Sequence, residues 1–284
     1  MGAPGFAAVG ERVGALVVSA AHPSPIEAEI VLRLRAAGSV FAEEEAALLV
    51  TEHTSDGTVD AAALDHAVHR RTTGEPLEVI VGWAEFCGLR LAVAPGVFVP
   101  RPRSALLVEL AVTLTRPGDV LLDLCCGVGA IAAAVAARVP RLEVHAAELD
   151  PIAAECAARN LPGGHVVVGD LYAPLPAALA GRIDVLVANA PYVPTSEIEL
   201  MPREARLHEL PATLDGGADG LDLHRRIAAE APRWLAPGGH LLIETSERQS
   251  PVTREILESA GLAARVERDD EADATVVIAS NPAV

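Results

Sequence analysis

Lysine is missing from this 284-residue sequence, so arginine carries every fixed positive side-chain charge. The 22 basic residues stand against 39 aspartates and glutamates, which gives a formal net charge of −17. A surface of this sign repels phosphate backbones unless a basic groove is concentrated in one place. The sequence contains no such cluster of arginines, and we therefore do not expect nucleic acid to be a main substrate.

Cysteine is also scarce, and its positions form no metal-binding or disulfide pattern. The four cysteines are Cys87, Cys125, Cys126 and Cys156. The neighbours Cys125 and Cys126 lack the spacer of a Cys-x-x-Cys pair, and no histidine falls into a zinc-ligand spacing with them. We therefore expect reduced thiols, no metal site and a cytoplasmic location.

Long apolar runs are absent, although 51% of the residues are hydrophobic. No stretch reaches the roughly 18 uncharged apolar residues that a membrane-spanning helix needs. The apolar run from Val13 to Ala21 is short and follows Glu11 and Arg12, so we expect no signal peptide. A chain of this length suffices for one large domain or two modest ones, and the sequence leaves the oligomeric state open.

The N-terminal quarter of the chain has a helical pattern. Apolar residues recur at helical spacing around 13–17, 26–34, 46–50 and 61–71. Gly74-Glu75-Pro76 then interrupts the pattern. We predict a small helical domain over residues 1–76 and interpret it as a recognition or packing module.

In residues 77–102 the spacing of the apolar residues changes from a helical to an extended pattern. Val79–Val81 and Leu89–Val93 look like strands on either side of a turn at Cys87-Gly88. Prolines between 95 and 102 exclude a helix from the segment that follows. We predict a β-hairpin and an extended linker here.

In residues 103–284 apolar strands alternate with helical patterns. The apolar runs end at Asp123, Glu148, Val168, Asn189 and Thr245, and a helix over 252–260 precedes a strand over 274–280. Short buried strands that alternate with helices predict a Rossmann-like α/β domain, with a mostly parallel sheet covered on both faces.

The first candidate site is the sequence from Asp123 to Gly129, which we call the glycine turn. An apolar strand runs into Cys125-Cys126-Gly127-Val128-Gly129, and a helix follows. Such a turn lets the backbone approach a ligand closely and presents amide donors to it. Tight turns between a strand and a helix also need glycine for structural reasons alone, so the turn is not decisive by itself.

Two acids end the next strands. Glu148 closes the second strand, at the distance from the glycine turn where an acid accepts the hydroxyls of a ribose. Asp150 before Pro151 is expected to cap the next helix. Asp170, after the third strand, could accept a hydrogen bond from an adenine amine with Leu171 against the ring, although the residue taken alone fits a solvated loop acid better.

The strongest signal is Asn189-Ala190-Pro191-Tyr192, which we call the acceptor turn. A planar amide nitrogen is a poor nucleophile because its lone pair is delocalised. A site that uses it must accept hydrogen bonds from both N–H groups, and the Asn189 side chain and the Ala190 carbonyl offer two fixed acceptors. Tyr192 can pack on the planar group. We predict methyl transfer to an amide or amine nitrogen.

Taken together, these motifs resemble the release-factor glutamine methyltransferases, the HemK/PrmC family. The resemblance extends over nearly the whole chain, and Asp215-Gly216-Gly217 soon after the acceptor turn is its most specific part. It implies a class I fold with a seven-stranded sheet and S-adenosylmethionine as the cofactor. The implied partner is a translation release factor, docked with help from the helical domain and methylated on the glutamine of its Gly-Gly-Gln loop.

The resemblance also implies a role for individual residues. Asp123, Cys125, Gly127 and Gly129 would form the cofactor pocket, with Glu148 and Leu149 at the ribose and Asp170 and Leu171 at the adenine. Asn189, Ala190, Pro191 and Tyr192 would hold the glutamine amide, with Asn189 also beside the cofactor. Phe98 and Arg101 would line the entry for the substrate.

Two single residues and two short segments depart from the family pattern. Ala190 replaces a proline and Cys125 replaces a glycine, while Arg103-Ser104-Ala105 stands for Glu-Thr-Glu and Glu244-Thr245-Ser246 for Glu-Ile-Gly. Alternative acceptors therefore stay open: another protein or peptide, a small molecule, or a nucleobase amine, which the charge disfavours. A cofactor-binding regulatory protein without turnover is a further alternative.

One long segment separates the acceptor turn from the next helix. We hypothesise that Thr195–Gly220 is a mobile lid, because it is long and polar. Within it, His208 and Glu209 are expected to be an exposed pair of loop residues.

Overall fold

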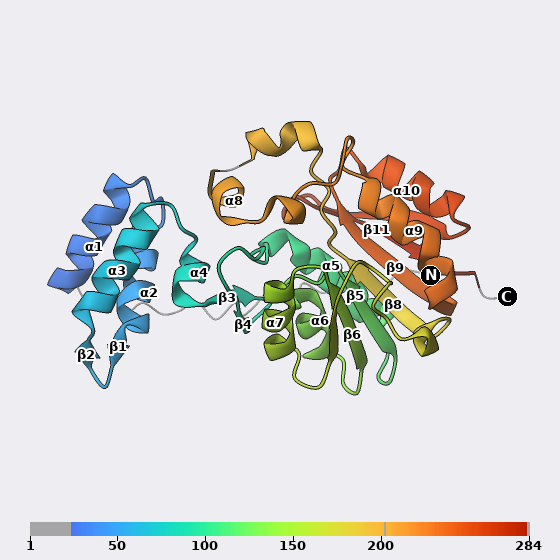
Figure 1. Cartoon of the computed structure of the whole chain (residues 1–284), viewed down its shortest axis with the longest axis horizontal. Helices are drawn as coiled ribbons and strands as arrows, with labels where there is room; N and C mark the ends of the chain where they lie inside the picture. Colours follow the sequence, from blue (N-terminus) through green and yellow to red (C-terminus); the bar gives the residue numbers. More distant parts are fainter. Residues whose placement is uncertain (1–23, 202, 283–284) are drawn as a thin grey trace, which may run out of the picture. The chain divides into compact units, whose positions relative to one another are not determined.

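Three helices form the first part of the computed structural model, which describes residues 24–201 and 203–282. The chain divides into two compact units, Met1–Thr72 and Thr73–Val284. In the first unit α1 (Pro25–Ala36) is followed by α2 (Ala42–Glu52) and α3 (Ala61–Thr72), and a short hairpin of β1 (Thr54–Ser55) and β2 (Thr58–Val59) connects α2 to α3 (Figure 1). The helix predicted around 13–17 lies outside the described residues.

The three helices of the first unit have their own core and local stops. Ser24 and Glu27 form a capping box at the start of α1, which satisfies otherwise unpaired backbone donors. Leu34, Leu49 and Val68 are fully buried between the helices. The three segments predicted as helical over 26–71 are thus helices in the structure.

The second unit begins with a helix where the sequence predicted a strand. Val79–Val81, which the β-branched residues predicted as a strand, belongs to the short helix α4 (Leu77–Val81). Pro76 stands before the first residue of α4, and Gly82 ends the helix with a φ of +80°, which favours glycine. The hairpin itself is formed by β3 (Trp83–Phe86) and β4 (Leu89–Ala92).

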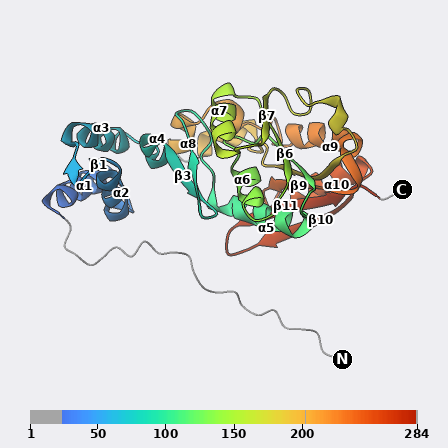
Figure 2. The ribbon, with the colours of Figure 1, turned by 90° about the horizontal axis from the view of Figure 1, so that it is seen from below.

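A seven-stranded sheet is the centre of the second unit. Its strand order is β10-β11-β9-β8-β5-β6-β7, and Figure 2 shows β7 and β10 at opposite sides of the sheet. The strands are β5 (Val120–Leu124), β6 (Glu143–Glu148), β7 (His165–Val168), β8 (Ile183–Ala188), β9 (Leu235–Thr245), β10 (Ala263–Asp269) and β11 (Ala274–Ser280). All neighbours from β7 to β9 are parallel, and β11 is antiparallel to both β9 and β10. The predicted Rossmann-like, mostly parallel sheet is confirmed.

Helices cover both faces of this sheet. On one face lie α5 (Ala105–Leu114), α6 (Ala130–Ala136) and α7 (Pro151–Asn160), and on the other lie α9 (Asp222–Trp234) and α10 (Ser250–Ser259) (Figure 1). Consecutive residues of the central strands point to opposite cores: Leu121 packs with the first set of helices and Leu122 with the second. Because both faces are covered, all five residues of β5 are buried.

Strand β10 was missed by the sequence patterns. Its residues alternate between exposed and half-buried, and charged side chains such as Arg265, Glu267 and Arg268 occupy much of it. This composition is typical of an edge strand that pairs on one side only. Among the described residues, no helix is both long and apolar enough to cross a membrane.

Candidate functional site

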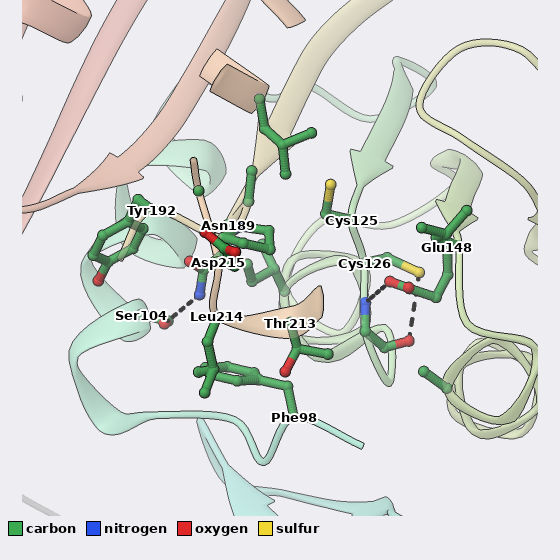
Figure 3. A pocket seen from close by; sticks show the side chains of 18 of the residues that line it. Phe98, Ser104, Cys125, Cys126, Glu148, Asn189, Tyr192, Thr213, Leu214 and Asp215 are labelled. Carbon is green, nitrogen blue, oxygen red and sulfur yellow. Dashed lines mark hydrogen bonds between the residues drawn. The ribbon is translucent and has the colours of Figure 1, made fainter. Parts of the chain in front are cut away.

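A cavity of about 680 Å³ lies at the carboxyl ends of the central parallel strands (Figure 3). Most of the side chains proposed from the sequence line it together: Phe98, Arg101, Cys125, Gly127, Glu148, Leu149, Asp170, Leu171, Asn189, Ala190, Pro191 and Tyr192. Asp123 and Gly129 do not reach its wall. Ligands of open α/β sheets bind at this end of the strands, so the cavity is the candidate site.

Gly129 contributes to the site by allowing close packing between two helices. It has a φ of +75°, and a side-chain carbon added there would lie 3.0 Å from Cδ1 of Leu161 and 3.2 Å from Cβ of Ala157. The glycine therefore allows the start of α6 to approach α7 closely. This contact fixes the direction in which the glycine turn enters the helix.

Glu148 is buried at the end of β6 and holds the glycine turn through one oxygen. Oε2 accepts a hydrogen bond from the Gly127 amide at 2.7 Å (Figure 3). Oε1 accepts one from the Asp150 amide at 2.9 Å. A carboxylate oxygen can accept more than one hydrogen bond, so both oxygens retain capacity for a ligand's hydroxyl groups. Asp150 caps α7 as predicted, accepting from the amides of Ile152 and Ala153.

Asp123 is the first residue of the glycine turn and is fully buried. Oδ2 accepts a hydrogen bond from the Ala132 amide at 3.1 Å, whereas Oδ1 is buried without a partner among the described residues. Burial raises the pKa of Asp123 to about 7, and the nearby Glu148 carboxylate adds to this shift. A positively charged ligand at the turn would favour the ionised form.

Cys125 occupies a backbone position that suits glycine. Its φ of +54° is in the left-handed region, which costs a non-glycine residue about 1 kcal/mol or more. Burial, reinforced by the charge of Glu148, raises the pKa of the Cys125 thiol well above its usual range. The thiol is therefore neutral and is a wall of the cavity rather than a nucleophile.

Asp170 is not a simply solvated loop acid. Its Oδ2 lies 2.6 Å from Nη2 of Arg226, which projects from α9 and also lines the cavity. Leu171, beside it, is buried with a φ of +48°. The ion pair connects the loop after β7 to the helix α9, and no local sequence pattern pointed to Arg226.

The acceptor turn is held through the side chain of Asn189. Its Nδ2 donates a hydrogen bond to Oγ of the buried Ser104 at 3.2 Å (Figure 3). This contact uses one of the two N–H groups of the amide and fixes its orientation, which leaves Oδ1 as the end that can accept from a ligand. Ser104 was missed as a site residue, although it stands where the family has threonine and so keeps a hydroxyl group.

Tyr192 is fixed by two charged residues that are far apart in sequence. Its hydroxyl donates to Oε1 of Glu244 at 3.4 Å, and the Arg103 guanidinium lies 5.9 Å from the centre of its ring. Arg103 Nε donates to the same Glu244 oxygen at 3.3 Å. Burial and the Glu244 charge raise the pKa of Tyr192, so its hydroxyl stays protonated.

The entry to the cavity is closed on one side by the segment after the acceptor turn. This segment contains the 3-10 helices η3 (Thr195–Leu200) and η4 (Pro211–Thr213) and the helix α8 (Arg203–His208). The expectation that Glu209 is exposed is wrong: it is buried and forms an ion pair with Arg101. A β-bridge between Glu209 and Gly96 holds it there, with the Leu210 amide donating to the Gly96 carbonyl at 3.3 Å.

Phe98 and Arg101 both line the cavity and lie close to each other. The Arg101 guanidinium is 5.0 Å from the centre of the Phe98 ring, within the range of a cation–π contact. Thr213 and Leu214 also line the cavity (Figure 3). Over residues 24–201 and 203–282, no group of three or more histidine, cysteine, aspartate or glutamate side chains is placed to hold a metal ion.

Comparisons with known proteins agree with this geometry. The family model described as "Methyltransferase small domain" matches residues 89–217. A release factor glutamine methyltransferase of Streptomyces coelicolor is 44% identical over 188 residues, which is 64% of this chain and 66% of that protein, just under two thirds of its length. One from Mycolicibacterium smegmatis is 42% identical over 198 residues, covering 68% of this chain and 70% of that protein.

Two further similarities bear on the acceptor and the fold. A 4-amino-L-phenylalanine/4-methylamino-L-phenylalanine methyltransferase of Streptomyces pristinaespiralis is 40% identical over 193 residues, 65% of each protein. The crystal structure of a methyltransferase from Pyrococcus furiosus has a TM-score of 0.52 at 21% identity, covering 69% of this chain and 90% of that one. At this identity the last similarity concerns the fold alone.

Proposed function

The chain belongs to the release factor glutamine methyltransferase family, and we propose that it transfers a methyl group from S-adenosylmethionine to the side-chain amide nitrogen of a protein glutamine. The proposed acceptor is the glutamine in the Gly-Gly-Gln loop of a translation release factor, which places the reaction in the cytoplasm. Asn189 carries this assignment, because Ser104 holds its donor end and leaves its oxygen for the acceptor.

The residues of the cavity fit the cofactor. Glu148 offers two buried carboxylate oxygens to the ribose hydroxyls, and Leu149 and Leu171 supply apolar surface for the adenine near Asp170. Oδ1 of Asp123 has no hydrogen-bond partner among the described residues, and a cationic ligand nearby would favour the ionised form of this carboxyl group. When bound, S-adenosylmethionine supplies an electrophilic methyl group on a positively charged sulfur.

The acceptor turn provides what an amide nucleophile needs. Oδ1 of Asn189 and the backbone carbonyl of Ala190 accept hydrogen bonds from the two N–H groups, which fixes the direction of the nitrogen. Tyr192, protonated and half-buried, packs against the planar amide. Orientation supplies most of the rate, and no strong general base is required because the methylated amide loses its proton readily to solvent.

We expect the full-length protein with S-adenosylmethionine to add one methyl group to the Gly-Gly-Gln glutamine of the source organism's release factors. Peptide mapping by mass spectrometry measures this directly. Asn189→Ala removes the side-chain acceptor and should lower the rate by about 100-fold, as loss of one preorganised hydrogen-bonding group does in other active sites. Cofactor binding without transfer to any acceptor would instead support the regulatory alternative.

A second candidate acceptor is an aromatic amine that carries a carboxylate. The similarity to the 4-amino-L-phenylalanine enzyme favours it, as does Arg103, which stands where the family has glutamate and lines both the cavity and the adjoining groove. 4-Amino-L-phenylalanine should therefore be tested as an acceptor beside the release factors. Methylation of the amine with no change in the release factors would overturn the glutamine assignment.

A further inference from the structure

Residues 215–222, which we call the aspartate–glycine loop, pack against the back of the acceptor turn. The Gly216 amide donates to the Val193 carbonyl at 2.9 Å, and the Val193 amide donates to the Leu214 carbonyl at 3.1 Å. The Thr195 amide is bound in turn by the Gly217 carbonyl at 2.9 Å. The chain that leaves the acceptor turn is thus paired along its length with this loop.

One side chain joins these two segments to a third. Gln249, at the start of α10, is buried, and its Nε2 donates to the carbonyl of Tyr192 at 2.9 Å and to the carbonyl of Asp219 at 3.0 Å. The Ser246 hydroxyl donates to Oε1 of Gln249 at 2.5 Å, which orients the amide so that its donor end points at the two carbonyls. Every polar atom of this amide therefore has a defined partner.

The glycine at position 220 makes room for this contact. Gly220 has a φ of +79°, and a side-chain carbon added there would lie 2.2 Å from the Tyr192 carbonyl oxygen and 2.4 Å from Nε2 of Gln249. Any larger residue would displace one or both of them. Gly220 is thus explained by the space that the Gln249 amide occupies, whereas Gly216 and Gly217 leave room for the Gly220 backbone and the Asp222 side chain.

We propose that Gln249 is a positioning residue for methyl transfer: its amide fixes the Tyr192 backbone, and so sets the tilt of the ring against the acceptor. This inference rests on the proposed function, in which the acceptor turn holds the acceptor nitrogen. Ala190 stands where the family has a second proline, so this turn has less stiffness of its own. The Gln249 contact supplies rigidity from outside the turn.

Gln249→Glu tests the proposal, because the carboxylate has the same shape and cannot donate to either carbonyl. We expect kcat for the full-length protein to fall by about 10- to 100-fold, as a displacement of about 1 Å at a reacting group does. The dissociation constant of S-adenosylmethionine, measured by calorimetry, should stay within about twofold, because a purely positional effect leaves affinity unchanged. Arg254→Gln, on the exposed face of α10, is the matched control and should match the wild type in both measurements.

A second pair of variants keeps the test decisive if Gln249→Glu folds poorly. Gln249→Met and Gly220→Ala should each lower kcat, and the double variant should lose no more than the worse single one, since both disrupt one contact. Hydrogen exchange should quicken at the Val193 and Gly216 amides in each. Additive losses, or a Gln249 variant with faster exchange at these amides and wild-type kcat, would overturn the proposal; failure of the proposed function would appear as a wild-type protein that methylates no release factor.

Discussion

In the polar side chains around the cavity, some hydrogen-bonding capacity is used within the protein and some is left for a ligand. One end of Asn189 is bound by Ser104 while the other is left for a ligand, and Glu148 binds two backbone amides with oxygens that can each accept again. Holding one end in this way fixes the orientation of the other before a ligand arrives. Such preorganisation lowers the cost of binding and reaction.

Ser104 is the residue on which the orientation of Asn189 depends. We expect Ser104→Ala to lower kcat by about 5- to 10-fold, because one neutral hydrogen bond is worth roughly 1 kcal/mol. Ser104→Thr keeps the hydroxyl and should retain nearly wild-type turnover. Steady-state kinetics with saturating cofactor measures both, and equal kcat values for the alanine and threonine variants would show that the hydroxyl does not orient the amide.

Cys125 illustrates how far single residues could be interpreted from the sequence. Its departure from glycine was visible in the motif, and the left-handed backbone conformation explains why glycine is usual there. The contacts of Asp170, Tyr192 and Glu209 were not visible, because Arg226, Glu244 and Arg101 reach them from distant parts of the chain. Local patterns carry no information about such pairs.

At the scale of helices and strands, α9 and α10 meet around a buried histidine. His224 is fully buried, and its Nδ1 lies 3.0 Å from Oγ1 of Thr253. Nε2 is buried with no partner among the described residues. Burial lowers the pKa of His224 to about 4, and the positive charge of Arg225 adds to the shift. The contact between these helices therefore requires a neutral imidazole.

Acid should weaken the fold through His224. The unfolded chain takes up this proton near pH 6.5 and the folded chain only near pH 4, so the free energy of unfolding falls as the pH is lowered through that window. At pH 5 the loss from this residue is about 2 kcal/mol. Asp123, with its pKa raised to about 7, acts in the opposite sense over an overlapping range.

A variant without the imidazole separates the effect of His224 on the pH dependence of stability from that of Asp123. His224→Gln removes the titrating group and keeps a polar side chain, so its unfolding free energy should fall less between pH 7 and pH 5 than that of the wild type. Urea unfolding of both proteins at the two pH values gives the difference. Identical pH dependence in the two proteins would mean that His224 does not titrate in this range.

The elements themselves were predictable where burial dominates. Strands β5, β6, β8 and β9 have apolar runs because both faces of the sheet are covered, and their ends were placed within about two residues, the usual uncertainty of such boundaries. Strand β10 and helix α4 were not predicted, because their secondary structure depends on a neighbouring strand and on flanking residues rather than on a local apolar pattern. Helix α8 lies in a segment predicted as a loop, whose form depends on the bridge between Gly96 and Glu209.

At the scale of the whole molecule, the candidate site and most of the residues belong to one of the two units. The cavity and both large apolar clusters belong to Thr73–Val284, and the three helices before Thr73 contribute no residue to them. The second unit therefore has what it needs to fold and to bind the cofactor. A role of the first unit in recognition or packing stays a prediction from the sequence.

Removing residues 1–72 tests that division. We expect the fragment Thr73–Val284 to bind S-adenosylmethionine with the affinity of the full chain, because the cavity is intact. Its KM for a release factor should rise by about 10-fold or more, as loss of roughly 1.4 kcal/mol of docking energy gives, while KM for a short glutamine peptide should not change. A fragment with wild-type KM for the intact release factor would exclude the recognition role.

The open sheet has a consequence for self-association. Its two edges are strands that present unpaired backbone groups, and such edges recruit strands of other molecules into aggregates. Here one edge strand, β7, is only four residues long, and the other, β10, contains the charged residues Arg265, Glu267 and Arg268. A second molecule that approached either edge would find too few backbone partners or would bury charges. These edges thus hinder the growth of cross-β aggregates when the protein is concentrated.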